Sequence, residues 1–332
     1  MATDLSDTLV VGISATALFD LQQADDLWRS LQRDPDSAIE RYRAHMQEAE
    51  SEPLADGTGM PLIRALLSLN QYAGDPDRPL VEVVVMSRNS PETGIRVLNA
   101  IRGQHLPITR SAFTGGETVV DYLDAFAVDL FLTTEPVDAQ RVIDSRVCAA
   151  AVLKAPPTRQ AEIPAGQVRI AFDGDAVLFD DSSELVFKTE GLSAFQAAED
   201  RAQDVPLPEG PYANLLKKLS TLQDRLPMRV EYSPVRIAIV TARNSPADLR
   251  VIKTLRRWGV YVDEAFFLGG LSKSSVLKAF KPHIFFDDQD VHLREAAQYV
   301  PAAHVPYASG SPLRAVASPG DDQPATQSES SE

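Results

Sequence analysis

The sequence has almost no cysteine and no surplus of positive charge. Cys148 is the only cysteine among 332 residues, so no disulfide can form within the chain. A formal net charge of −15 argues against binding to a nucleic-acid polymer, because a phosphate backbone is held mainly by clustered Lys and Arg side chains. We therefore expect a protein of the reducing cytoplasm that captures any anionic substrate locally.

Long apolar runs are also missing. No segment approaches the roughly 20 apolar residues that a membrane span requires, and the first residues lack the basic stretch of a signal peptide. The protein is therefore expected to be neither exported nor bound to a membrane. With 44% apolar residues, the chain nevertheless has enough material for two domains with their own cores.

Short β-rich apolar runs alternate with helix-like segments along the chain. This rhythm predicts an α/β fold with parallel sheets. The predicted strands span residues 8–13, 80–86, 130–133, 168–172, 235–240 and 283–286.

An internal repeat relates the two parts of the chain. Residues 80–135 align with residues 235–289, and the spacing shifts by one residue between the matching segments. Both copies contain Arg-Asn-Ser-Pro directly after a predicted strand, at 88–91 and at 243–246. The repeat predicts two related, Rossmann-like α/β domains, one after the other.

The repeat also sets the expected domain boundaries. Residues 1–150 form the first predicted domain and residues 151–307 the second. The second contains an insertion of mainly helical character at about residues 181–233. Residues 308–332 are rich in Ser, Pro, Gln and acidic residues, so we expect a disordered tail.

Acidic residues follow the predicted strands of the second copy only. Strand 168–172 runs into Asp173-Gly174-Asp175, at the carboxyl edge where open α/β sheets bind ligands. Two carboxylates at this place suit a metal cation, or a division of work between metal binding and proton exchange. Gly174 carries no side chain where the backbone must approach a ligand.

Three further residue types complete this pattern. Strand 283–286 is followed by Asp287-Asp288, which offers the hard oxygen ligands that Mg²⁺ prefers. Thr241, after strand 235–240, offers a hydroxyl and a backbone amide. Lys273 lies near the start of a predicted helix, where its cation can neutralise a phosphoryl group.

These four elements, in this order, resemble the haloacid dehalogenase superfamily of phosphotransferases: Asp-x-Asp, then Thr or Ser, then Lys, then Asp-Asp. Longer strings are similar to the cytosolic 5'-nucleotidase I family. They are Phe-Asp-Gly-Asp-Ala-Val-Leu-Phe at 172–179, Thr-Ala-Arg-Asn-Ser-Pro at 241–246, Phe-Leu-Gly-Gly-Leu-Ser-Lys at 267–273 and Ser-Arg-Asn-Ser-Pro-Glu-Thr-Gly at 87–94. The resemblance covers nearly all of the chain except its tail.

The resemblance implies a role for each matching residue. Asp173 is the expected nucleophile that forms an aspartyl-phosphate. Asp175 is the expected general acid and later general base. Thr241 and Lys273 would grip the phosphoryl oxygens. The expected Mg²⁺ ligands are Asp173, the carbonyl of Asp175, Asp287 and Asp288.

The implied activity is a Mg²⁺-dependent 5'-nucleotidase that hydrolyses a nucleoside 5'-monophosphate, such as AMP, to the nucleoside and phosphate. Two alternatives stay open: a sugar-phosphate phosphatase or phosphotransferase of the same superfamily, and a non-catalytic nucleotide sensor. The intact Asp173, Asp175, Lys273 and Asp287 argue against the sensor, which has no need of a nucleophile. A homo-oligomer is compatible with a duplicated chain.

Some residues have two interpretations. Arg243 and Asn244 fit either substrate binding or a loop that caps a helix. The same holds for Arg88 and Asn89, whose loop is retained in the copy that lacks the acids.

Other assignments also have rivals. Asp288 fits either a metal ligand or a turn cap. Lys278 or Lys281 could take the place assigned to Lys273, although the Gly-Gly-Leu-Ser-Lys context favours Lys273. The five histidines, including His292, show no metal-ligand spacing and are read as structural or surface residues.

The first copy is interpreted as a degenerate haloacid dehalogenase-like domain, so one active site per chain is expected. Residues 1–150 would serve structure, substrate binding, regulation or assembly, and the insertion in the second copy would be a cap over the active site. In an ungapped alignment the counterparts of Asp173, Asp175, Thr241, Lys273, Asp287 and Asp288 are Ile13, Ala15, Met86, Val119, Thr133 and Thr134.

Overall fold

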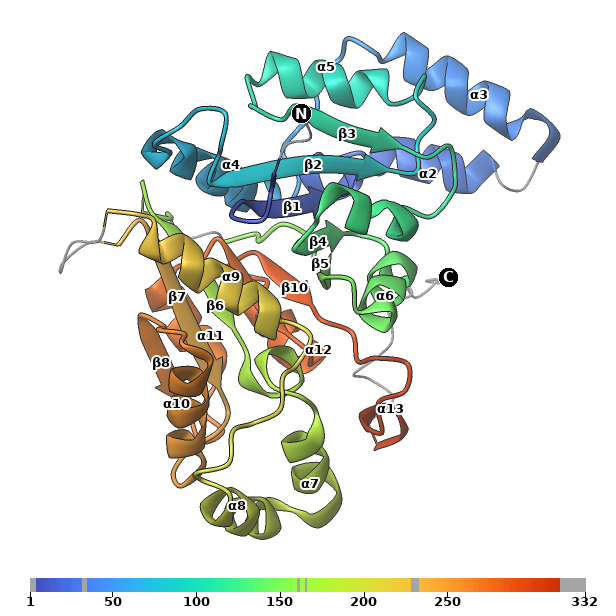
Figure 1. Ribbon diagram of the computed structural model, residues 1–332. Helices are drawn as coiled ribbons and strands as arrows, with labels where there is room; N and C mark the ends of the chain where they lie inside the picture. Colours follow the sequence, from blue (N-terminus) through green and yellow to red (C-terminus); the bar gives the residue numbers. More distant parts are fainter. Residues whose placement is uncertain (1–3, 32–34, 160–161, 165, 228–232, 317–332) are drawn as a thin grey trace.

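The computed structural model describes residues 4–31, 35–159, 162–164, 166–227 and 233–316 (Figure 1). Within this part of the chain, ten strands form one sheet in the order β3-β2-β1-β4-β5-β10-β9-β6-β7-β8. The strands are β1 (Leu9–Ile13), β2 (Val81–Ser87), β3 (Arg110–Phe113), β4 (Leu130–Thr133), β5 (Ala149–Leu153), β6 (Val168–Phe172), β7 (Val235–Thr241), β8 (Glu264–Phe267), β9 (Ile284–Asp287) and β10 (Ala302–His304).

One antiparallel pair joins two halves of this sheet. Ala303 and His304 of β10 lie opposite Leu153 and Val152 of β5, whereas the neighbouring strands within each half are parallel. Each half has the same strand order, counted outward from this joint. The strands of the two halves therefore run in opposite directions, and their carboxyl ends lie at opposite edges of the sheet.

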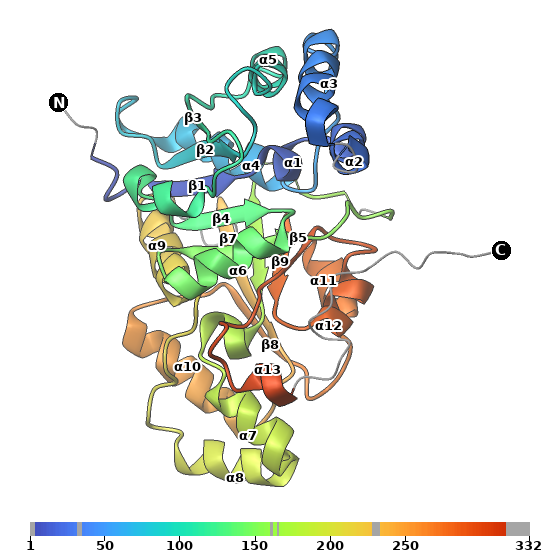
Figure 2. The ribbon, with the colours of Figure 1, turned by 90° about the vertical axis from the view of Figure 1, so that its right-hand side faces the viewer.

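Helices connect the parallel strands, and each half has helices inserted after its first strand (Figure 1, Figure 2). Helices α7 and α8 lie at the end of the molecule that is remote from the first half (Figure 2). The helices are α1 (Ala15–Leu18), α2 (Gln22–Leu31), α3 (Pro35–Glu48), α4 (Met60–Ser68), α5 (Ile95–Gly103), α6 (Pro136–Ser145), α7 (Ser182–Glu190), α8 (Leu192–Arg201), α9 (Ala213–Asp224), α10 (Ala247–Trp258), α11 (Lys273–Phe280), α12 (Asp290–Ala296) and α13 (Leu313–Val316). Shorter turns are η1 (Leu69–Tyr72), η2 (Val120–Tyr122), η3 (Asp124–Phe126) and the irregular turn η4 (Gly174–Leu178).

Buried aromatic rings fix the strand ends of the second half. The central strands are almost entirely buried, as expected for parallel strands that are covered on both faces. Phe172 stacks on Phe286 with 5.4 Å between ring centroids, and Tyr212 packs on Phe286 at 5.0 Å. These rings hold the ends of β6 and β9, next to Asp173 and Asp287.

The predicted α/β fold with a mostly parallel sheet is confirmed. The six predicted strands correspond to β1, β2, β4, β6, β7 and β9. The expectation of separate sheets was wrong, because β5 and β10 pair and merge the strands into one. The division into domains stays a prediction. In the described residues, no helix is long and apolar enough to cross a membrane.

The segment predicted as a disordered tail is structured at its beginning. Ser309 donates from its amide and its hydroxyl to Asp144 of α6, and Leu313 is fully buried. The polar composition of this segment did not indicate these hydrogen bonds or the burial of Leu313. Residues 317–332 and part of the predicted insertion, 228–232, lie outside the described residues.

Candidate active site

Three neighbouring strand ends bring the predicted site residues together. Asp173 follows β6, Thr241 ends β7 and Asp287 ends β9, and β6 lies between the other two strands. The amide of Asp173 donates to the carbonyl of Phe286 over 2.8 Å, which ties the first acid to β9. Each of these three residues is at most 4% exposed. The sequence pattern thus converges on one buried place.

Lys273 lies between two of the acids. Its Nζ is 2.7 Å from Oδ2 of Asp173 and 2.7 Å from Oδ2 of Asp287. Lys278, on the same helix, is exposed and lies 3.5 Å above the ring of Tyr299. Of these two lysines, Lys273 is therefore the one that contacts the acids.

Burial and charge oppose one another in this cluster. Burial alone would lower the pKa of Lys273, but the adjacent Asp173 and Asp287 carboxylates outweigh it and raise this pKa. Burial raises the pKa of Asp173 to about 6 against the opposing effect of Lys273. For Asp287, Lys273 and His292 outweigh the effect of burial and lower the pKa. Lys273 and Asp287 are therefore a charged pair.

Asp288 adds a third buried carboxyl group. Burial, together with Asp287 and Asp173, raises its pKa well above the usual value. Its Oδ2 accepts a 2.5 Å hydrogen bond from the hydroxyl of Tyr307. Its Oδ1 is buried without a hydrogen-bond partner among the described residues. One ammonium therefore faces three carboxyl groups, and one acceptor is left unsatisfied.

These residues fit a divalent cation. One ligand atom each from Asp173, Asp287 and His292 lies within 4.8 Å of the other two. Uncompensated carboxylates and an unsatisfied buried oxygen are the environment that a hard cation such as Mg²⁺ would complete.

His292 is a residue that sequence reasoning missed. It was read as structural or surface, but its Nδ1 lies 3.3 Å from Oδ2 of Asp287. The signal that could have found it is its position in the helix that begins directly after the Asp-Asp pair.

Asp175 is held by Arg243. The guanidinium donates from Nε and from an Nη to the two oxygens of Asp175, over 2.8 and 2.5 Å. Burial alone would lower the pKa of Arg243, but Asp175 and Glu199 raise it. Arg243, a candidate for substrate binding, therefore uses these donors to bind Asp175, the expected general acid.

Glu199 extends this network into helix α8. It accepts from Arg243 over 2.6 Å, from Arg250 over 2.8 Å and from the hydroxyl of Ser183 over 2.8 Å. Glu199 is only 2% exposed, and the ring of Phe195 lies 5.3 Å from the Arg243 guanidinium. Nothing in the sequence pattern singled out Glu199, because a lone Glu in a helix is usually solvated.

Gly174 and Asn244 have local structural partners. The amide of Gly174 donates to Oδ1 of Asp173 over 2.7 Å. A Cβ at Gly174 would lie 3.3 Å from the hydroxyl of Thr241, so a larger side chain would crowd the two loops. Asn244 is exposed and packs near Gly269. Their assignment to substrate binding stays a prediction.

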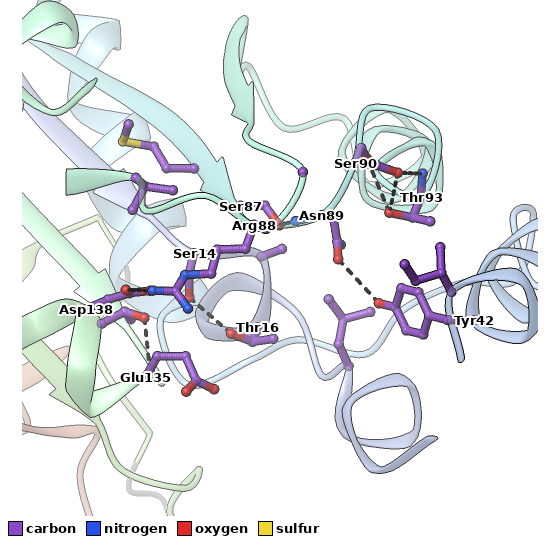
Figure 3. Close-up of a pocket in the computed structure, with 18 of the residues that line it drawn as sticks. Ser14, Thr16, Tyr42, Ser87, Arg88, Asn89, Ser90, Thr93, Glu135 and Asp138 are labelled. Atoms are coloured by element: carbon purple, nitrogen blue, oxygen red, sulfur yellow. Dashed lines mark hydrogen bonds and ion pairs between the residues drawn. The ribbon is translucent and has the colours of Figure 1, made fainter. Parts of the chain in front are cut away.

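The structure does not bring Arg88 and Asn89 to this site. They follow β2, whose carboxyl end lies at the opposite edge of the sheet from that of β6. Arg88 forms an ion pair with Asp138, and Oδ1 of Asn89 accepts from the hydroxyl of Tyr42 over 3.3 Å (Figure 3). Within one chain they cannot bind the same small substrate as Asp173.

The strand ends also correct the alignment of the two copies. β1 and β6 both have five residues, and β2 and β7 both have seven, so equivalent positions can be counted from the strand ends. The ungapped alignment was displaced by one residue in the first two strands. The counterparts of Asp173, Asp175 and Thr241 are Ser14, Thr16 and Ser87 instead of Ile13, Ala15 and Met86.

Comparison with known proteins identifies the family. A family model described as 5'-nucleotidase matches residues 1–312. Human cytosolic 5'-nucleotidase 1B (Homo sapiens) is 32% identical over 296 residues, which are 87% of this chain and 47% of the human protein. The chain thus spans about half the length of this relative. No solved structure matches it significantly. As the resemblance to the cytosolic 5'-nucleotidase I family predicted, the chain belongs to the 5'-nucleotidase family, whose enzymes are phosphoric monoester hydrolases.

Proposed function

We propose that this protein is a Mg²⁺-dependent 5'-nucleotidase that hydrolyses a nucleoside 5'-monophosphate, such as AMP. The observation that carries the proposal is the buried cluster of Asp173, Lys273 and Asp287 at the carboxyl ends of adjacent strands. Membership of the 5'-nucleotidase family supports hydrolysis of a phosphate monoester. The excess of carboxyl groups over cations supports a divalent metal requirement.

The proposed chemistry has two steps. An oxygen of Asp173 attacks phosphorus, the bond to the 5'-oxygen breaks, and Asp175 protonates the leaving nucleoside. Water then attacks phosphorus of the aspartyl-phosphate, Asp175 accepts its proton, and phosphate leaves. Lys273 and Thr241 would stabilise the phosphoryl oxygens in both steps.

Mg²⁺ would neutralise charge on the phosphoryl group when bound. The residues that would hold it are Asp173, Asp287, the carbonyl of Asp175 and Asp288.

The proton transfer sets a requirement on Arg243. Both Asp175 oxygens accept from Arg243. Asp175 can carry a proton to the leaving group only when one of these hydrogen bonds is given up. Glu199 of α8 accepts from the other Nη of the same guanidinium, so movement of α7 and α8 would change how firmly Arg243 holds Asp175.

Substrate profiling tests the proposal. Phosphate release would be measured for a panel of nucleoside monophosphates and sugar phosphates, with Mg²⁺ and with EDTA. We expect nucleotides to be hydrolysed at least about tenfold more efficiently than sugar phosphates, and EDTA to abolish both reactions. A preference for sugar phosphates would support a sugar-phosphate phosphatase of the same superfamily. If no compound of the panel is hydrolysed, the non-catalytic nucleotide sensor is supported.

The setting of the enzyme is part of the proposal. The single cysteine and the cytosolic human relative support a cytoplasmic protein, and the net charge of −15 disfavours a nucleic-acid partner. Self-association stays a prediction from the broad helical surfaces of the two halves.

A further inference from the structure

A cavity of about 640 Å³ opens at the carboxyl edge of the first half of the sheet (Figure 3). Its lining comes from the residues after β1, β2, β3 and β4 and from helix α3. None of the acids of the candidate active site lines it. It is the geometric counterpart of the active site, at the opposite edge of the sheet.

The lining has lost the groups that handle metal and phosphate. Each position that carries a carboxylate in the second half carries a hydroxyl in this cavity, and the position of the lysine carries an apolar side chain. These equivalent positions offer no carboxylate to a divalent cation and no buried ammonium to a phosphoryl group. Ser14, Thr16, Ser87, Val119 and Thr133 stand where Asp173, Asp175, Thr241, Lys273 and Asp287 stand in the other half.

The charges that remain in the lining offset one another. They belong to two arginines and two carboxylic acids: Arg43, Arg88, Glu135 and Asp138. Arg88 forms an ion pair with Asp138, and Nε of Arg43 lies 3.6 Å from Glu92. Both arginines therefore already face a carboxylate, and neither offers an unpaired cation to a phosphate. The electrostatics therefore favour a ligand without net charge.

The uncharged lining combines hydroxyls with flat and apolar surfaces. Oγ of Ser14 lies 3.1 Å from Oγ1 of Thr16, and further hydroxyls come from the loop after β2. The half-buried ring of Tyr42 lies on the opposite side of the cavity from the Arg88–Asp138 pair (Figure 3). This combination suits a flat ring that carries hydrogen-bonding groups and sugar hydroxyls.

We propose that this cavity is a metal-independent binding site for a nucleoside. Its volume falls within the range of roughly 300–1,000 Å³ that is usual for small-molecule sites. The base would pack against Tyr42, and the ribose hydroxyls would bond to the Ser and Thr side chains. The choice of a nucleoside rests on the proposed function, whereas the preference for an uncharged ligand follows from the lining alone.

Equilibrium binding in the full-length Asp173→Asn variant tests this site without turnover. The probes are four nucleosides, the corresponding monophosphates, ribose and inorganic phosphate, each in Mg²⁺ and in EDTA. We expect saturable binding of at least one nucleoside with the same affinity in both buffers. Nucleoside binding that needs Mg²⁺ would overturn the proposal, as would inorganic phosphate binding that is tighter than nucleoside binding and is lost in the cavity variants below.

Variants locate the binding in the cavity. Tyr42→Ala removes the aromatic wall, and Ile39→Arg places a long side chain at a lining position that is 55% exposed, so folding should survive. Both should weaken nucleoside binding at least about tenfold. Leu249→Arg, at a 50% exposed position in the other half, is the matched control and should leave binding unchanged.

Two further outcomes contradict the site. Binding that survives both cavity variants would place the ligand elsewhere, and the absence of nucleoside binding at millimolar concentration would exclude it. Neither outcome touches the proposed hydrolase activity, which is measured separately as phosphate release by the wild-type protein. Conversely, an inert wild-type enzyme that still binds a nucleoside in this cavity would refute only the hydrolase.

Discussion

At the scale of single residues, Lys273 lies between the buried carboxyl groups of Asp173 and Asp287, with its Nζ 2.7 Å from each. Lys273→Met leaves these charges without a cation, so we expect a loss of about 3–5 kcal/mol of stability in EDTA. Mg²⁺ should restore part of this loss, because the cation can bind the two carboxylates once the Lys273 ammonium no longer competes for them. Thermal unfolding in EDTA and in Mg²⁺ measures both effects. Lys278→Met, at an exposed lysine of the same helix, is the control, and equal melting temperatures of the two variants in EDTA would contradict this account.

His283, before β9, should make stability depend on pH. Burial lowers its pKa to about 4 from 6.5, and its Nδ1 accepts from the amide of Arg169 over 3.0 Å. Between these values the unfolded chain binds more protons than the folded one, so stability falls as the pH falls from 6.5 towards 4. His283→Asn retains an acceptor without titrating.

Urea unfolding at pH 7.5 and pH 5 checks this prediction. The wild type should lose about 2 kcal/mol more than His283→Asn between these pH values. Parallel losses in the two proteins would show that His283 does not titrate in this way.

The sequence predicted the identity of the clustered residues better than their contacts. The positions of Asp173, Thr241, Lys273 and Asp287 could be found because each lies at the end or the start of a recognisable element. The bond of Arg243 to Asp175 could not, because it depends on how two loops and helix α8 pack together. Side-chain pairing of this kind leaves no periodic signal in the chain.

At the scale of elements, helix α8 is linked to the candidate active site by Glu199. We expect Glu199→Gln to weaken the grip on Arg243, and thereby to lower kcat about tenfold with little change in KM. Steady-state kinetics, with a pH profile of kcat, measure this positioning role. Glu190→Gln, at an exposed position of α7, is the control. An unchanged kcat and pH profile in Glu199→Gln would show that the network is only structural.

Whether a strand could be predicted from the sequence followed both its burial and its content of β-branched residues. β5 is buried but was missed, because three of its five residues are Ala. β6 and β7 are buried runs with several β-branched residues, and both were predicted. β3 and β8 are four-residue strands at the two edges of the sheet, where half of the pairing and much of the burial are missing, and both were missed. β10 has three residues, too few to show a pattern.

At the scale of the whole molecule, the antiparallel joint places the two Arg-Asn-Ser-Pro loops at opposite edges of the sheet. Arg88→Ala should therefore change kcat/KM less than about threefold, whereas Arg243→Ala should lower it about a hundredfold. The two substitutions are matched, because they remove the same side chain from equivalent loops. A large rise of KM in Arg88→Ala would mean that the first half contributes to the substrate site.

The joint itself was beyond sequence reasoning. The internal repeat indicated two similar halves, but the pairing of β5 with β10 depends on contacts between distant segments. The repeat therefore indicated the shared strand order of the two halves, but not that their strands join in one sheet.

The most direct test of the central claim is the rate of phosphate release from nucleoside monophosphates by Asp173→Asn. Loss of the proposed nucleophile should lower the rate about a thousandfold or more, while the melting temperature stays at or above that of the wild type. Asp204→Asn, at a side chain that is 84% exposed, should keep the wild-type rate. A folded Asp173→Asn protein with near wild-type phosphate release would contradict the proposed mechanism.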